Sequence, residues 1–239
     1  MARKKCRGKS VGGATRHPTP DTRFFTRPST NIVTEPKPTV FIIDDDPSVR
    51  KSLSRLLRSV GHVVETFPSA EAFLTREHFD GIGCIILDVQ MPGLSGMDLQ
   101  VELSKAEYGM PIVFITGHGD IPMSVEAMRK GAVHFLTKPF DDDELLRAIG
   151  EAIERDRKAK SKQTEVQDIR RRVSLLTPRE YEILRYVITG MLNKQIALKL
   201  NIAEKTVKVH RGRIMEKLRV DSVAELVRLA EKTGIEPSK

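Results

Sequence analysis

The chain has 239 residues and a formal net charge of +8, and its two cysteines are Cys6 and Cys84. This length allows two modest domains with separate hydrophobic cores. No apolar run is long enough for a membrane span and no apolar leader opens the chain, so we expect a cytoplasmic protein without a membrane partner. One cysteine lies in a polar tail and the other in a strand-like run, which argues against a structural disulfide.

The charge is distributed unevenly, being basic in residues 1–38, acidic in 39–169 and basic again in 170–239. An acidic centre suits a metal and phosphoryl site, whereas a basic end favours a nucleic-acid partner. Residues 1–38 have no hydrophobic period, which predicts a disordered tail. Because Val33 opens a stretch that looks like a natural protein start, we hypothesise that translation begins near it and that residues 1–32 are not translated natively.

Residues 39–157 alternate between strand-like and helix-like patterns. Apolar runs predict strands near 39–43, 62–65, 84–88, 111–115 and 133–137. Helical periodicity predicts helices near 47–60, 70–76, 96–106, 121–131 and 141–157, with Asp46 as the cap of the first. This order is typical of a parallel sheet with helices on both faces, an α/β domain.

Residues 158–172 are charged and are interpreted as a linker or as a helical extension of the preceding helix. In the domain that follows, residues 173–239, Thr177 and Glu180 have the spacing of a capping box. The next turns predict a helix whose buried stripe consists of Tyr181, Leu184, Val187 and Ile188.

Three more helices complete this second domain. Asn193 is expected to cap a helix over Lys194–Leu200, and a three-residue turn leads to a helix over Glu204–Leu218. A last helix is expected over about Ser222–Lys232. Two short helices joined by such a turn are a helix-turn-helix pattern.

Polar residues follow four of the predicted strands. Asp44 and Asp45 follow the first strand, Asp88 the third, Thr116 the fourth and Lys138 the fifth. The carboxyl ends of parallel strands share one edge, so these residues are expected to form one site. Clustered carboxylates call for a divalent cation, and Mg²⁺ is the natural choice. With the metal bound, Asp88 could attack a phosphoryl donor, and Lys138 and Thr116 could bind the phosphoryl oxygens.

Each of these residues also has a plainer interpretation. One aspartate of the first group can serve as a helix cap, a lone aspartate at a strand end is commonly a turn residue, and Lys138 could be a solvated surface charge. The functional interpretation depends on their combination in strand order at one sheet edge.

Residues 39–160 resemble the receiver domain of two-component response regulators, through the segments FIIDDDPSVR, LDVQMPGLSG, FITGHGD and GAVHFLTKPF. The segment LTPREYEILRYVITGMLNKQIALKLNIAEKTVKVHRGRIMEKL resembles the LuxR-type helix-turn-helix. The pair is the architecture of the NarL/FixJ family, with closest similarity to FixJ-like members. The resemblance implies a flavodoxin-like (βα)5 receiver domain followed by an all-α four-helix helix-turn-helix domain.

The resemblance also assigns roles at the acidic site. It implies that Asp88 is the phosphoacceptor and that a sensor histidine kinase is the donor, with no separate enzymatic activity. It places Mg²⁺ on Asp44, Asp45, Asp88 and the backbone carbonyl of Gln90, with Asp45 the more direct ligand of the acidic pair. It makes Thr116 the switch hydroxyl, Phe135 the switch aromatic and Lys138 the site lysine, with a cis bond before Pro139.

The predicted helix 204–218 has two faces. Val207, Ile214 and Leu218 form one, and the opposite, basic face suits a DNA major groove: Lys205, Lys208, Val209, Gly212 and Arg213. By resemblance, Lys208 and Val209 reach base edges of double-stranded promoter DNA, whereas the phosphate contacts come from Lys205, Thr206, Arg211 and Arg213. Two departures are Ala203, where a capping serine is common, and Gly212, which weakens the helix.

The hypothesis for the mechanism is a phosphorylation switch. Phosphate on Asp88 draws Thr116 inward, Phe135 buries, and the face made by helix 121–131 and the last strand repacks. Val125 and Arg129 are the candidate contacts of a homodimer. The output is expected to be transcriptional activation, with RNA polymerase as a possible further partner.

Two alternatives belong to different classes. A phosphohydrolase of the haloacid-dehalogenase kind also uses aspartate, threonine and lysine, but its nucleophile follows the first strand and a second aspartate comes two residues later. The other alternative is a constitutive DNA-binding protein whose receiver domain serves only for partner docking.

Overall fold

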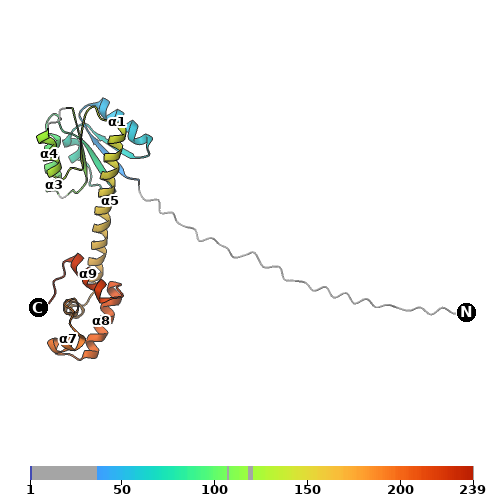
Figure 1. Cartoon of the computed structure of the whole chain (residues 1–239), viewed down its shortest axis with the longest axis vertical. Coiled ribbons are helices and arrows are strands. Elements are labelled where there is room, and N and C mark those ends of the chain that lie inside the picture. The colour runs from blue at the N-terminus through green and yellow to red at the C-terminus, as the bar shows by residue number, and fades with distance from the viewer. Residues whose placement is uncertain (2–36, 107, 118–120, 239) are drawn as a thin grey trace. The chain divides into compact units, whose positions relative to one another are not determined.

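The computed structural model describes residue 1 and residues 37–106, 108–117 and 121–238 (Figure 1). The predictions of a tail without structure and of a start near Val33 lie outside the described residues. No helix in these ranges is both long enough and apolar enough to cross a lipid bilayer.

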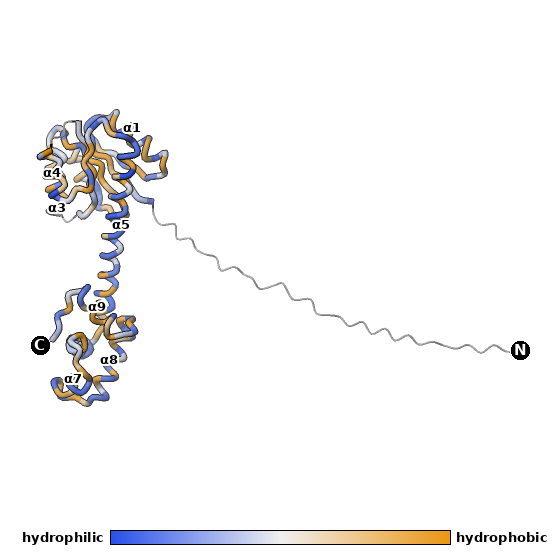
Figure 2. The backbone as a smooth tube through the Cα atoms, viewed as in Figure 1, coloured by the Kyte–Doolittle hydropathy of each residue, from blue (hydrophilic) through white to orange (hydrophobic). Residues whose placement is uncertain are grey.

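The first domain is built on five parallel strands, as the sequence predicts, and their order in the sheet is β2-β1-β3-β4-β5. The strands are β1 (Thr39–Ile43), β2 (Val63–Phe67), β3 (Gly83–Asp88), β4 (Ile112–Thr116) and β5 (His134–Thr137). The helices are α1 (Pro47–Ser59), α2 (Ala70–Leu74), α3 (Gly96–Lys105), α4 (Ile121–Arg129) and α5 (Asp142–Val173). In Figure 2 the strands are mostly orange, because their side chains are apolar on both faces.

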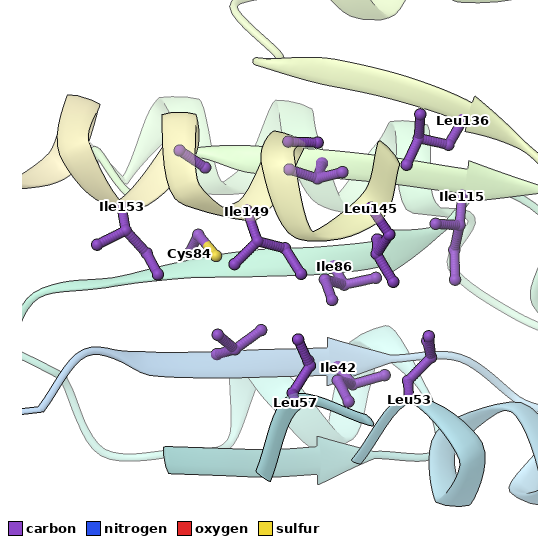
Figure 3. Packing of buried hydrophobic residues seen from close by; sticks show 14 of the residues in the cluster. Ile42, Leu53, Leu57, Cys84, Ile86, Ile115, Leu136, Leu145, Ile149 and Ile153 are labelled. Carbon is purple, nitrogen blue, oxygen red and sulfur yellow. The ribbon is translucent and has the colours of Figure 1, made fainter. Parts of the chain in front are cut away.

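The side chains of β1 alternate between two hydrophobic clusters, one on each face of the sheet. Val40 and Ile42 join α1 and α5 on one face, where Leu57 and Ile149 are fully buried (Figure 3). Phe41 and its neighbours join the other face, which α2, α3 and α4 cover. Because the sheet is covered on both sides, chemistry has room only at its edges.

Two predictions about α1 and α5 have clear outcomes. The Asp46 carboxylate accepts the Ser48 N–H at 2.7 Å and caps α1, as predicted. Helix α5 does not end near Arg157, the predicted end, but continues to Val173, so the segment 158–172 is a helical extension of it. Its last turns place Ile169 among the buried residues of a separate hydrophobic core, that of the second domain.

The second domain consists of α6 (Pro178–Val187), α7 (Asn193–Leu200), α8 (Glu204–Leu218) and α9 (Val223–Thr233), packed with the end of α5. The capping box of Thr177 and Glu180 is present. Tyr181 does not belong to the buried stripe: it is exposed, and Ile183 is buried instead. The buried face contains Glu180, and Tyr181 lies one residue later, about 100° around the helix.

The predicted cap of α7 is also wrong. Leu192 occupies the cap position, and its N–H donates to the Gln195 side chain at 2.8 Å. Asn193 is the first residue of the helix, and its side chain has a different partner. Ala203 precedes α8 and makes no side-chain cap, which agrees with the departure seen in the sequence.

Candidate functional site

Three carboxylates meet at the carboxyl edge of the sheet. Asp44 and Asp45 follow β1, and Asp88 ends β3, the strand beside it. One ligand oxygen from each lies within 4.8 Å of the others. Asp44 and Asp88 are buried, whereas Asp45 is exposed and faces solvent. The arrangement is an acidic pocket that is open on one side.

Lys138 brings the positive charge to this pocket from the end of β5. Its Nζ donates to Asp44 Oδ2 at 2.8 Å and to Asp88 Oδ2 at 2.9 Å. Its backbone N–H donates to the Thr116 carbonyl at 2.7 Å, and the bond to Pro139 is cis, as the resemblance implies. The lysine therefore joins the end of β5 both to Asp44 and to the proposed acceptor, Asp88.

The electrostatics of the pocket are unbalanced. Burial raises the pKa of Asp44, although the Lys138 ammonium and the Asp46 N–H both donate to its carboxylate. Burial opposes the charge of Lys138, but its hydrogen bonds to Asp44 and Asp88 outweigh it and raise the pKa of Lys138. The Lys138 ammonium thus bonds two of the three clustered carboxylates, and the oxygen donors left over fit a small hard divalent cation.

The loop after Asp88 is held close to the strand. A side chain at position 96 would place its Cβ 2.1 Å from the Asp88 carbonyl oxygen, so only glycine fits there. Gly96 N–H donates to Val89 O at 3.0 Å, and Gln90 N–H donates to Asp88 Oδ1 at 3.1 Å. Gln90 therefore adjoins the acceptor carboxylate, while the metal-binding role of its carbonyl stays a prediction.

Thr116 and Phe135 lie on one face of two paired strands. Phe114 pairs with Phe135 and Thr116 pairs with Thr137, so alternate residues of β4 point to the side where Phe135 lies. Thr116 is completely buried, and Phe135 is half-buried with its ring centre 6.1 Å from that of Phe114. This face packs in the cluster that includes α4.

One residue at this site, Arg50, was not predicted from the sequence. Its Nη1 donates to the backbone carbonyls of Asp44 at 2.6 Å and Asp45 at 2.9 Å. These bonds reach back from α1 and fix the turn that carries the acidic pair. A possible signal is the position of the arginine one helical turn after the aspartate cap, where a long side chain can return to the preceding loop.

Helix α4 carries an exposed apolar stripe. Ile121, Val125 and Met128 are 80%, 50% and 46% exposed, and their spacing places them on one face. Arg129 is also exposed at the end of the helix. The two proposed dimer contacts, Val125 and Arg129, are thus both accessible in this chain.

The two faces of α8 are as predicted. Val207, Ile214 and Leu218 are buried, and the predicted DNA-contacting residues that are exposed are Lys205, Thr206, Lys208, Val209 and Arg213. Arg211 differs because it is partly buried and its Nη1 donates to Asn193 Oδ1 on α7 at 2.8 Å. The structure therefore places Arg211 at the seam between the two helices and away from the centre of the exposed face.

Comparisons with known proteins agree with both domains. Residues 40–150 match the family described as "Response regulator receiver domain", and residues 174–230 match "Bacterial regulatory proteins, luxR family". Nodulation protein W of Bradyrhizobium diazoefficiens is 49% identical over 199 residues, which cover 83% of this chain and 88% of that protein. Transcriptional regulatory protein FixJ of the same organism is 42% identical over 196 residues, covering 82% and 96%. The solved structure of response regulator StyR is 50% identical, with a TM-score of 0.75 over 82% of this chain and 100% of that one.

The fold, the acidic pocket and these matches define a two-component response regulator with a LuxR-type DNA-binding domain. Such a protein is a transcription regulator with a sensor kinase and DNA as its partners. The chain belongs to the NarL/FixJ family, as predicted. It is a transcription factor that accepts a phosphoryl group and is not a catalytic enzyme, so the phosphohydrolase alternative is excluded.

Proposed function

We propose that this protein acts in the cytoplasm, that a sensor histidine kinase transfers its phosphoryl group to Asp88, and that this transfer promotes dimerisation and promoter binding. The observation that carries the proposal is the position of Lys138, which bonds the carboxylates of both Asp44 and Asp88. An Asp88 oxygen attacks phosphorus, the N–P bond of the phosphohistidine breaks, and an acyl phosphate forms. Lys138 is then within reach of the new phosphoryl oxygens.

Mg²⁺ would be held by Asp45, Asp88 and the Gln90 carbonyl, with Asp44 acting more through water. When bound, the ion supplies positive charge to the phosphoryl oxygens during transfer. The support for this assignment is the donor set itself, three carboxylates whose ligand oxygens lie within 4.8 Å of one another. Carboxylate oxygens in this number, partly open to water, suit Mg²⁺.

Phosphorylation would be reported through the hydroxyl of Thr116 and the ring of Phe135. Both side chains belong to the face that packs toward α4, where Phe135 is only half-buried and has room to become more so. An inward shift of Thr116 toward the phosphoryl oxygens would let Phe135 follow and α4 repack. Support for α4 as the dimer surface is its stripe of Ile121, Val125 and Met128, beside Arg129.

Dimerisation would place two α8 helices at half-sites about one helical turn apart. The exposure of Lys208 and Val209 suits contact with base edges. Phosphate contacts are assigned to Lys205, Thr206, Arg211 and Arg213. We propose that the bound dimer activates transcription, with RNA polymerase as its partner at the promoter.

The test measures mass and DNA affinity together. The full chain is treated with acetyl phosphate and Mg²⁺, and its mass is followed by analytical ultracentrifugation and its promoter binding by gel shift. We expect the mass to double and the affinity to rise about tenfold or more, with neither change in Asp88→Asn. The matched control is Asp80→Asn, at an exposed position on a loop of the same domain, which should behave like the parent chain. Equal mass and affinity before and after treatment would favour the constitutive DNA-binding alternative.

A further inference from the structure

We propose that Asn193 is a positioning residue for DNA binding: it orients Arg211 toward a phosphate without neutralising the arginine. The proposal rests on the phosphate contact assigned to Arg211 under the proposed function. The observation that carries it is the hydrogen bond from Arg211 Nη1 to Asn193 Oδ1, 2.8 Å long, between α8 and α7.

Arg211 needs such an anchor because of its place on α8. It lies four residues after Val207 and three before Ile214, and both of these side chains are fully buried or nearly so. Arg211 therefore projects from the flank of the helix next to the core, toward α7, and is itself partly buried. A guanidinium has five N–H donors in a fixed plane, so one bond to Asn193 fixes the plane and leaves donors for a phosphate.

Asn193 is free to take this role because it does no capping. Leu192 holds the cap position of α7, and Gln195 accepts the Leu192 N–H. The Asn193 amide therefore contributes its oxygen to α8 and not to the end of its own helix.

The chemistry of the acceptor distinguishes this contact from the arginine ion pairs of the same domain. Arg171 and Arg172 pair with Asp168, and Arg179 pairs with Glu182. Each of those charges is largely compensated before any ligand arrives. The acceptor for Arg211 is a neutral amide, so its full positive charge stays available for a phosphate and for the release of a counterion.

The experiment measures non-specific binding, which depends mainly on phosphate contacts. The probe is a labelled 30-base-pair duplex of mixed sequence, titrated with the full chain between 50 and 200 mM KCl by fluorescence anisotropy. The variants are Arg211→Gln, Asn193→Ala, Asn193→Asp and the double variant Asn193→Ala with Arg211→Gln. Circular dichroism checks that each variant retains its helices.

We expect Arg211→Gln to weaken binding several-fold and to reduce the salt slope by about one. Asn193→Ala should weaken binding about threefold or more with the slope almost unchanged, since the charge remains but is no longer oriented. Asn193→Asp should orient the arginine but compensate its charge, and so reduce the slope as Arg211→Gln does. An acidic residue in the first turn also favours a helix, so a loss in this variant is not a loss of fold.

The double variant decides the inference. If Asn193 acts through Arg211, adding Asn193→Ala to Arg211→Gln should cause no further loss. Full additivity, or an Asn193→Asp variant with parental slope and affinity, would overturn the positioning role while leaving the Arg211 contact in place. An unchanged slope in Arg211→Gln alone would overturn the proposed contact, and the inference with it.

Discussion

Each of the two domains contains a lysine that is bonded to a buried carboxylate. The two sites differ in the number of carboxylates that lie near the lysine. At the sheet edge, Lys138 is shared by Asp44 and Asp88 at 2.8 and 2.9 Å. In the helical domain, Lys217 bonds one carboxylate, that of Glu180, at 2.7 Å, and also donates to the Leu175 carbonyl. The lysine side chains are 24% and 34% exposed and their partners are buried, so neither distance nor burial separates the two sites.

The pKa values of the carboxylates do separate them. The Lys217 ammonium and the Thr177 N–H hold the pKa of Glu180 at about 2, because they satisfy one charge completely. At the sheet edge burial raises the pKa of Asp44 despite Lys138, and Asp45 adds a further acidic group. A matched pair of charges stabilises a fold, whereas an excess of one sign creates a site that can bind a cation and react.

The largest effect is expected from removing the reactive carboxylate. Asp88→Asn should abolish incorporation of the phosphoryl group, because an amide cannot form the acyl phosphate. The measurement is intact-protein mass spectrometry after acetyl phosphate and Mg²⁺. Glu180→Gln is the matched control: it removes the carboxylate of the balanced site and should leave labelling unchanged. Persistent labelling of Asp88→Asn would move the acceptor to another residue.

The next effect comes from removing the shared ammonium. Lys138→Met should lower the free energy of unfolding of the receiver domain by about 3–5 kcal/mol without metal, because the buried carboxylates lose their only ammonium partner among the described contacts. Mg²⁺ should restore part of this loss, since it binds the folded state. Urea unfolding with and without Mg²⁺ measures both. A loss that Mg²⁺ does not reduce would argue against a cation site.

Breaking the balanced pair should give a similar but pH-dependent loss that no metal repairs. The pKa of Glu180 falls from 4.5 to about 2 on folding, so its stabilisation is complete above pH 4.5 and disappears as the pH falls toward 2. Glu180→Gln should therefore cost on the order of 3 kcal/mol at pH 7 and little near pH 2. Hydrogen exchange of α6 peptides across this range tests it. An equal loss at both ends would assign the effect to packing.

The sequence predicted the sheet and the acidic pocket because both follow from strand order. The side chains of β1 alternate between the two faces of the sheet, and the carboxyl ends of β1 and β3 place Asp44 and Asp88 together whatever the loops do. Arg50 and Asn193 were missed because their roles depend on where a long side chain reaches across a turn or a helix seam. No periodicity records such a contact.

The length of α5 was left open for a related reason. The composition of 158–172 is charged, and charge suits a linker and a solvated helix equally well. Two contacts in the structure favour the helix over a looser linker. Asp156 bonds Lys160 one helical turn later, and Ile169 is buried among α6 to α9.

The smallest effect should come from a pair that is balanced but exposed. Glu102 and Lys105 on α3 lie 2.8 Å apart, with 48% and 66% of their side chains exposed. Water screens them, so Glu102→Gln should change the free energy of unfolding by no more than about 0.5 kcal/mol. Urea unfolding of this variant beside Glu180→Gln separates burial from charge balance. Equal losses would mean that pairing stabilises wherever it occurs, whereas a small loss here shows that balance matters only where solvent is excluded.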